Sequence, residues 1–137
     1  MGDASVKPSF TSVTIYTRRI PEMVEFYSRH FGYTAFQRPG DRIVGLRPPG
    51  AGAVIRLHPA AKSQKVGQAL VKLNFDVEDV VAFARAAKKR GLEFGPLHDG
   101  MGYTYANAKD PSGNSISISG RAAAAARSEA FDVPYVP

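Results

Sequence analysis

The sequence predicts an α+β fold: two βαβββ modules in tandem, forming a curved mixed sheet around a cup with the helices on the outer face. Two observations predict it. Each half of the 137-residue chain reads as a strand, a helix and three further strands. Corresponding positions of the two halves also lie about 60 residues apart: Ser12 and Lys72, Gly32 and Gly91, Arg56 and Ser117. A repeat of this length exceeds a solenoid unit and indicates a duplicated module.

The first module is expected over residues 10–58, after an N-terminal extension of residues 1–9. Residues 10–17 alternate β-branched or aromatic residues with polar ones, which is typical of a strand. Pro21 suits the first turn of a helix because its φ is fixed and it lacks an N–H. An apolar stripe at helical spacing then leads to Gly32, where a left-handed cap fits. Turn residues separate three expected strands, 33–38, 41–47 and 51–58.

A polar linker, residues 59–67, precedes a second module with the same order over residues 68–120. We expect a strand at 69–75 and a helix that begins after an Asp79 cap and ends near Arg90, before Gly91. Further strands are expected at 92–96, 103–108 and 114–119. Residues 121–137 form a C-terminal tail whose alanine run favours helix. Its apolar residues, among them Phe131 and Tyr135, have no evident partner, so they pack across a subunit boundary or the tail is disordered.

The composition is that of a globular protein, with 44% hydrophobic and 22% charged residues. No cysteine is present, which excludes disulfides and thiolate metal sites and fits a cytoplasmic location. No apolar run approaches the roughly 20 residues that span a membrane. The net charge of +6 suits an anionic ligand or simple solubility. The lysines and arginines are scattered and lack the aromatic motifs of RNA readers, so we expect no nucleic-acid partner.

Strand alternation places polar residues on one face of the first and fourth strands of each module. This pattern describes either the solvated side of an antiparallel sheet or the lining of a ligand cup. Because it recurs on four strands at matched repeat positions, we favour the cup. The polar positions are Ser12, Thr14, Tyr16, Arg56, His58, Lys72, Asn74, Asp76, Ser115, Ser117 and Ser119.

Three local motifs resemble those of the vicinal-oxygen-chelate superfamily of glyoxalases, extradiol dioxygenases, fosfomycin-resistance enzymes and bleomycin-binding proteins. They are Glu25-Phe26-Tyr27 ahead of Phe31-Gly32-Tyr33, Val77-Glu78-Asp79-Val80 ahead of Gly91, and Asp110-Pro111-Ser112-Gly113-Asn114 before the last strand. The resemblance covers residues 10–120 and implies the two-module fold. It also implies a homodimer whose cups are built from modules of both subunits.

Metal-dependent members of that superfamily carry His and Glu ligands on the first and fourth strands. The matching positions here are Ser12, Arg56, Lys72 and Ser117. Two of them are cationic and two are weak hydroxyl donors, so we expect neither a metal nor another cofactor. A register shift of one residue would replace them with apolar side chains.

We therefore expect a metal-independent binding protein that holds a small anionic or acid-bearing molecule through Arg56 and Lys72, with His58 adding charge at mildly acid pH. Either cation could instead be neutralised internally by Asp76 or Asp41. The alternative function is a metal-independent isomerase or lyase, or a relative that lost its metal, with His58 or Lys72 as general base. We expect binding rather than catalysis. The expected ligand-binding residues are Ser12, Thr14, Arg56, His58, Lys72, Asn74, Tyr103, Tyr105 and Ser117.

Overall fold

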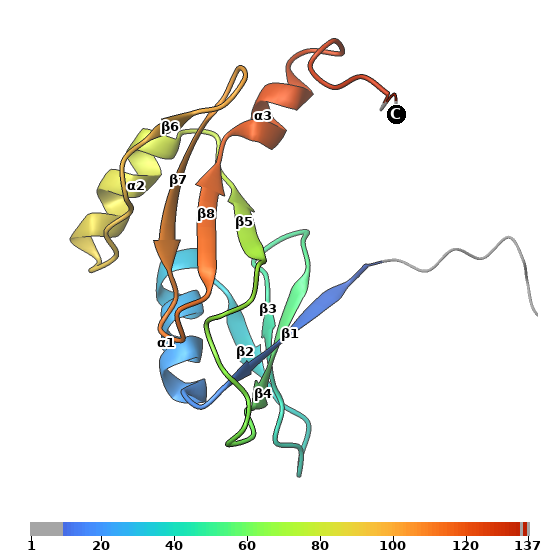
Figure 1. The fold of residues 1–137 in the computed structure, drawn as a ribbon, viewed down its shortest axis with the longest axis vertical. Coiled ribbons are helices and arrows are strands. Elements are labelled where there is room, and N and C mark those ends of the chain that lie inside the picture. The colour runs from blue at the N-terminus through green and yellow to red at the C-terminus, as the bar shows by residue number, and fades with distance from the viewer. Residues whose placement is uncertain (1–9, 135, 137) are drawn as a thin grey trace, which may run out of the picture. The chain divides into compact units, whose positions relative to one another are not determined.

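The computed structural model describes residues 10–134 and residue 136. The chain divides into two compact units, Met1–Gln64 and Lys65–Pro137. Each unit contains one four-stranded sheet, ordered β1-β4-β3-β2 in the first unit and β5-β8-β7-β6 in the second (Figure 1). The predicted α+β class with two tandem βαβββ modules is confirmed, and each module has its own mixed sheet.

The first module follows the predicted order of elements. In its sheet β1 and β4 are parallel, whereas β3 is antiparallel to both β4 and β2. This mixed pattern follows from the helix, which carries the chain back so that β1 and β4 run in the same direction. The elements are β1 (Ser12–Thr17), α1 (Ile20–Phe31), β2 (Thr34–Phe36), β3 (Val44–Arg47) and β4 (Val54–Pro59).

Helix α1 begins and ends where its sequence predicts. Pro21 lies in the first turn, and the Arg19 guanidinium hydrogen-bonds Glu22 and lowers the pKa of that exposed carboxyl. Gly32 adopts a left-handed φ of 71° and donates its N–H to the Ser28 carbonyl, which caps the last turn. Met23 and Tyr27 are fully buried, so the apolar stripe forms the core of this module.

His30 lies in the last turn of α1 and belongs to the core rather than to the surface. The structure buries it to 8% exposure, and its ring packs edge-on against Phe26 at 5.0 Å between centroids. His30 is four residues after Phe26, so it lies on the same helix face as the apolar stripe. It is therefore part of the core of the first module.

The second module repeats the arrangement. Asp79 caps α2 as expected, since its side chain accepts a hydrogen bond of 2.9 Å from the Ala82 N–H. Strands β5 and β8 are parallel, and β7 is antiparallel to β8 and to β6. The elements are β5 (Lys72–Asp76), α2 (Val80–Lys89), β6 (His98–Asp99), β7 (Thr104–Lys109), β8 (Ser115–Ser119) and α3 (Arg121–Ala126).

The strand expected at residues 92–96 does not form. Leu92 and Phe94 are buried and Glu93 is exposed, so the alternation that suggested a strand is present. This segment makes one strand-like bond, from the Gly95 N–H to the Asn107 carbonyl at 2.9 Å. Pro96 follows and has no N–H to continue a ladder. The sheet edge is formed instead by the two residues of β6, which pair with β7.

Residues that correspond in the sequence repeat also occupy corresponding positions in the two sheets. In the first module Thr14 lies opposite Arg56, and in the second Asn74 lies opposite Ser117. These pairs are related by shifts of 60 and 61 positions. The fully buried Leu57 of β4 and Ile118 of β8 are likewise 61 positions apart. The duplication therefore holds residue by residue along the two parallel strand pairs.

The turn between β7 and β8 is organised by one buried carboxylate. Asp110 Oδ1 accepts hydrogen bonds of 2.9 Å from the backbone N–H groups of Ser112 and Asn114. The Asn114 side-chain amide donates a further bond of 2.9 Å to Asp110 Oδ2. Gly113 supplies the left-handed φ of 82° that the turn requires. The motif thus sets the register of β8.

Replacing Asp110 with alanine should lower the free energy of unfolding by about 1 to 3 kcal/mol, because the buried N–H of Ser112 and the part-buried N–H of Asn114 lose their acceptor. Asp110→Asn keeps one carbonyl oxygen and should lose less. Urea unfolding of the two variants beside the wild type measures both effects. Equal stability of Asp110→Ala and the wild type would contradict this role of the carboxylate.

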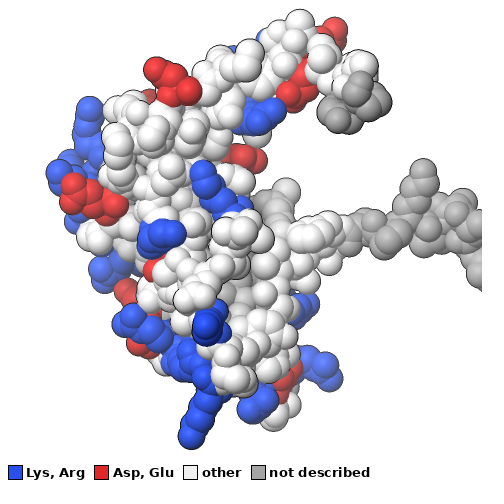
Figure 2. All heavy atoms as spheres, in the orientation of Figure 1, with Lys and Arg blue, Asp and Glu red and all other residues white. Residues whose placement is uncertain are grey.

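The net positive charge is concentrated in the first half of the chain, because acidic residues are fewer there. Residues 1–64 contain nine Lys and Arg against four Asp and Glu, whereas residues 65–137 contain nine against eight. In Figure 2 blue side chains gather over the region of β2 to β4, and blue and red alternate over the second module.

Among the described residues, no helix is long and apolar enough to cross a membrane.

Candidate functional site

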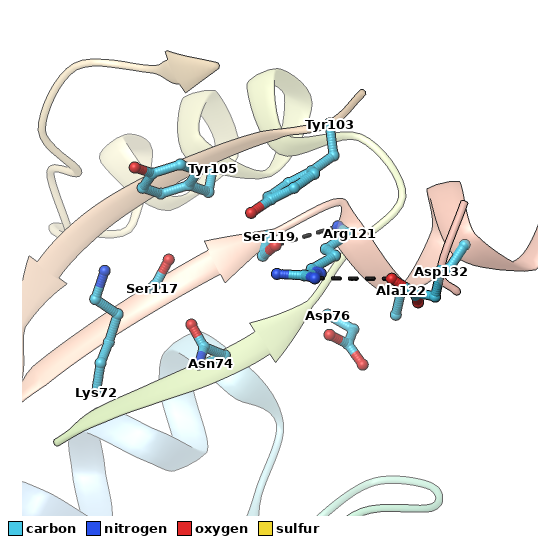
Figure 3. A pocket seen from close by; sticks show the side chains of 11 residues that line it. Lys72, Asn74, Asp76, Tyr103, Tyr105, Ser117, Ser119, Arg121, Ala122 and Asp132 are labelled. Atoms are coloured by element: carbon cyan, nitrogen blue, oxygen red, sulfur yellow. Dashed lines mark hydrogen bonds and ion pairs between the residues drawn. The ribbon is translucent and has the colours of Figure 1, made fainter. Parts of the chain in front are cut away.

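The second module carries a pocket of about 670 Å³ on the polar face of its sheet. Three strands supply the floor and two sides, and the segment after β8 supplies another wall (Figure 3). The lining residues are Lys72, Asn74 and Asp76 of β5, Tyr103 and Tyr105 at β7, Ser117 and Ser119 of β8, and Arg121, Ala122, Ala125 and Asp132 beyond it.

Strand alternation explains why these side chains share a face. Ile116 and Ile118 of β8 are fully buried in the apolar core, so the serines between and after them point the other way. Ser117 lies opposite Asn74 on one side and Asn107 on the other. It is 1% exposed and forms the floor of the pocket beneath larger side chains. The pocket is therefore a consequence of the polar alternation seen in the sequence.

Lys72 is held at one end of the pocket by neutral groups. Its Nζ donates a hydrogen bond of 3.0 Å to Asn107 Oδ1 and lies 5.4 Å from the centroid of the Tyr105 ring. Internal neutralisation by Asp76 is absent, because the ion pairs found among residues 10–134 do not include Lys72 or Arg56. Asp41, the other suggested partner, accepts a bond from the Ile43 N–H. The ammonium of Lys72 can thus meet an acidic group of a ligand.

An aromatic wall runs along β7. The rings of Tyr103 and Tyr105 are 6.1 Å apart, and His98 of β6 stacks on Tyr105 at 5.1 Å. Phe131 contacts Tyr103 from the other side at 6.2 Å. Such a wall offers flat apolar surface beside hydroxyl groups, which suits a ligand that has both a ring and polar substituents.

The tail closes the other end of the pocket. As expected, its alanine run is helical, and α3 places Arg121 over the Tyr103 ring at 5.6 Å. The Arg121 guanidinium pairs with Asp132 at 3.7 Å. Phe131 packs within its own module, which corrects the expectation that it lacks a partner there. Tyr135 lies outside the described residues.

Five of the residues that line the pocket were expected ligand-binding residues, and the others were not. Lys72, Asn74, Tyr103, Tyr105 and Ser117 were expected ligand-binding residues, and the structure brings all five together. Asp76 and Ser119 were placed on the same polar face but were not among the expected ligand-binding residues. Arg121 and Asp132 carry no such signal, because their position depends on how the tail folds back onto β7.

The remaining expected residues belong to the first module. Thr14 and Arg56 are exposed neighbours on β1 and β4, and Ser12 precedes them on the same face. His58 is half-buried, with Nδ1 2.8 Å from the Pro59 carbonyl and its ring 5.0 Å from that of Tyr16. These residues form a polar face equivalent to that of the second module. Their contribution to one cup together with Lys72 stays a prediction.

The four positions that match the metal ligands of related enzymes do not fit a divalent cation. Ser12 and Ser117 offer hydroxyls, and Arg56 and Lys72 offer positive charge that would repel the ion. The Lys72 ammonium acts as a hydrogen-bond donor to Asn107. Within residues 10–134, no three His, Asp or Glu side chains gather in a way that could hold a metal.

The sequence matches a family model for the Glyoxalase/Bleomycin resistance protein/Dioxygenase superfamily over residues 9–118. The chain belongs to this superfamily. The match ends one residue before the end of β8, so α3 and the Asp132 segment lie outside the part that defines the superfamily. In a comparison with curated proteins, no sequence matches the chain.

Several solved structures share the superfamily fold. An antibiotic-binding protein from Streptomyces sp. CB03234 is 19% identical, with a TM-score of 0.69 over 82% of this chain and 96% of its own. A superfamily member from Sphaerobacter thermophilus is 21% identical, with a TM-score of 0.67 over 82% and 97%. A lactoylglutathione lyase from Agrobacterium tumefaciens is 17% identical, with a TM-score of 0.64 over 82% and 93%. Identities this low support the fold alone.

Proposed function

We propose that this protein binds a small acid-bearing organic molecule in the pocket of its second module, without a divalent metal. The observation that supports it most directly is the pocket of about 670 Å³, whose size lies within the range of small-molecule sites. Its lining combines an aromatic wall with several hydrogen-bonding groups. Proteins of the same fold include one that binds an antibiotic, which is consistent with a binding role.

Lys72 supports an acidic ligand rather than a neutral one. Both pocket cations face the cavity, but Arg121 already has a carboxylate partner, whereas Lys72 is bonded to the neutral Asn107. The lining contains two cations, Lys72 and Arg121, and two carboxylates, so its net charge is zero. The preference for an anion therefore rests on the Lys72 end, where no carboxylate is paired with the ammonium, and not on a general excess of charge.

A rod-shaped aromatic acid is a suitable probe. Lys72 and Asp76 are four residues apart on β5, which a strand spaces by about 13 Å. Calorimetric titration should show that biphenyl-4-carboxylate binds about three- to tenfold more tightly than biphenyl-4-carboxamide, as expected for one partly exposed charged contact. Equal binding of acid and amide would refute the acid preference. Binding of neither would refute the pocket as a site for such ligands.

Metal independence and a homodimer are also proposed. Phe10 and Leu70 precede the first strands of the two modules, 60 positions apart, and are exposed by 83% and 103%. These two exposed side chains are the proposed apolar contacts of the dimer interface. A native mass spectrum of protein purified without chelators should show a dimer with no bound metal. A monomer, or one divalent ion per site, would contradict the respective part of the proposal.

A further inference from the structure

The pocket contains two similar cation and tyrosine pairs with different neighbours. Lys72 Nζ lies over Tyr105 at 5.4 Å and Arg121 lies over Tyr103 at 5.6 Å. Lys72 is bonded to a neutral amide, whereas the Arg121 guanidinium is paired with the Asp132 carboxylate. Figure 3 places Lys72 at one end of the pocket and Arg121, Asp132 and Asp76 towards the other. The pocket therefore has two potential anion positions, one at Lys72 and one at Arg121, and the Asp132 carboxylate lies at the second.

We propose that Asp132 occupies a second anion subsite at Arg121 and thereby restricts the pocket to ligands with a single acid group, held at the Lys72 end. This inference rests on the proposed function, because it assumes that the pocket binds an acid. It makes Asp132 a specificity-determining residue. The Asp132 charge offsets that of Arg121, so the second acid group of a ligand with an acid at each end gains little at Arg121 while the pair is intact.

The tail places Asp132 at Arg121 through contacts of its own. The Phe131 N–H donates to the Ser128 carbonyl at 3.2 Å, and the Phe131 ring packs against Tyr103. A Cβ added at Gly102 would come within 3.2 Å of the Phe131 ring, so the glycine leaves room for this packing. The neighbouring residue, Asp132, is thereby brought to the mouth of the pocket.

The pair between Arg121 and Asp132 is of the kind that a ligand can replace. The two side chains are 61% and 62% exposed, and their nitrogen and oxygen are 3.7 Å apart. Exposed ion pairs are weak because water and salt screen them. Removing the Asp132 charge should therefore make Arg121 accessible without loss of the fold.

The test compares biphenyl-4-carboxylate with biphenyl-4,4′-dicarboxylate on the wild type and on Asp132→Asn, by calorimetric titration. In the wild type we expect the dicarboxylate to bind no more tightly than the monocarboxylate. The dicarboxylate should bind to Asp132→Asn about two- to fivefold more tightly than to the wild type, which is the contribution of one exposed ion pair. Binding of the monocarboxylate should change little. Glu129→Gln is the matched control, since it removes one exposed carboxylate from the same segment.

A selective gain for the dicarboxylate in Asp132→Asn, abolished by adding Arg121→Gln, would support the proposal. An equal gain for both probes, an equal gain in Glu129→Gln, or no change would overturn it. In those cases tight binding of the monocarboxylate leaves the proposed function intact. If neither probe binds to either protein, the proposed function and this inference both fail.

Discussion

Replacing Ile118 with alanine should lower the free energy of unfolding of the second module by about 2 to 5 kcal/mol. Ile118 is fully buried on β8, on the face opposite Ser117, and three methyl or methylene carbons would be lost from the core. The side chain cannot be replaced by water because its surroundings are apolar. Thermal and urea unfolding, followed by circular dichroism, measure the loss.

Leu57→Ala is the matched variant in the first module. Leu57 is also fully buried and is the repeat equivalent of Ile118 on β4. If the duplication is reflected in the packing, both variants should lose stability within the same range of about 2 to 5 kcal/mol. Val133→Ala, at a position 77% exposed, should change stability little. A loss below about 1 kcal/mol for either core variant would contradict the packing described.

Lys72→Glu should weaken binding of biphenyl-4-carboxylate by about 10- to 30-fold, since an attractive contact becomes a repulsive one and each contributes about 1 kcal/mol when partly exposed. The glutamate would also lose the hydrogen bond that Lys72 donates to Asn107. The fold should remain intact, because Lys72 is exposed on an edge strand. Calorimetric titration in low salt gives the change in affinity.

Lys89→Glu controls for the change in net charge. Lys89 is exposed near the end of α2, outside the pocket lining, and its replacement changes the total charge by the same amount. Arg56→Ala extends the test to the first module. This variant should lower the affinity for biphenyl-4-carboxylate only if the polar face of the first module also contacts the ligand. Equal weakening by Lys72→Glu and Lys89→Glu would show that long-range charge, and not contact in the pocket, governs binding.

The fold was largely predictable because periodicity and turn residues are local signals. Helix α1, the Asp79 cap and the β7–β8 turn each follow from a few adjacent residues. The strand expected at 92–96 failed because alternation reports burial and not pairing, and Pro96 cannot continue a ladder. The burial of His30 is also not evident from its sequence, because the contacts of a polar residue near a helix end depend on its neighbours in space.

The candidate site was partly predictable. Alternation on β5 and β8 identified Lys72, Asn74 and Ser117 because a strand fixes which face each side chain takes. Nothing local indicates that Arg121 and Asp132 approach each other across ten intervening residues. That contact accompanies the packing of Phe131 against the Tyr103 ring, which is a tertiary interaction.

The most direct test of the central claim is a heteronuclear NMR titration of the isotope-labelled protein with biphenyl-4-carboxylate, before and after treatment with EDTA. The account predicts saturable shifts of the backbone amides of Lys72, Asn74, Tyr105 and Ser117, unchanged by the chelator. Shifts confined to other parts of the chain would contradict the pocket assignment. Shifts that vanish with EDTA and return on addition of a divalent metal would contradict metal-independent binding.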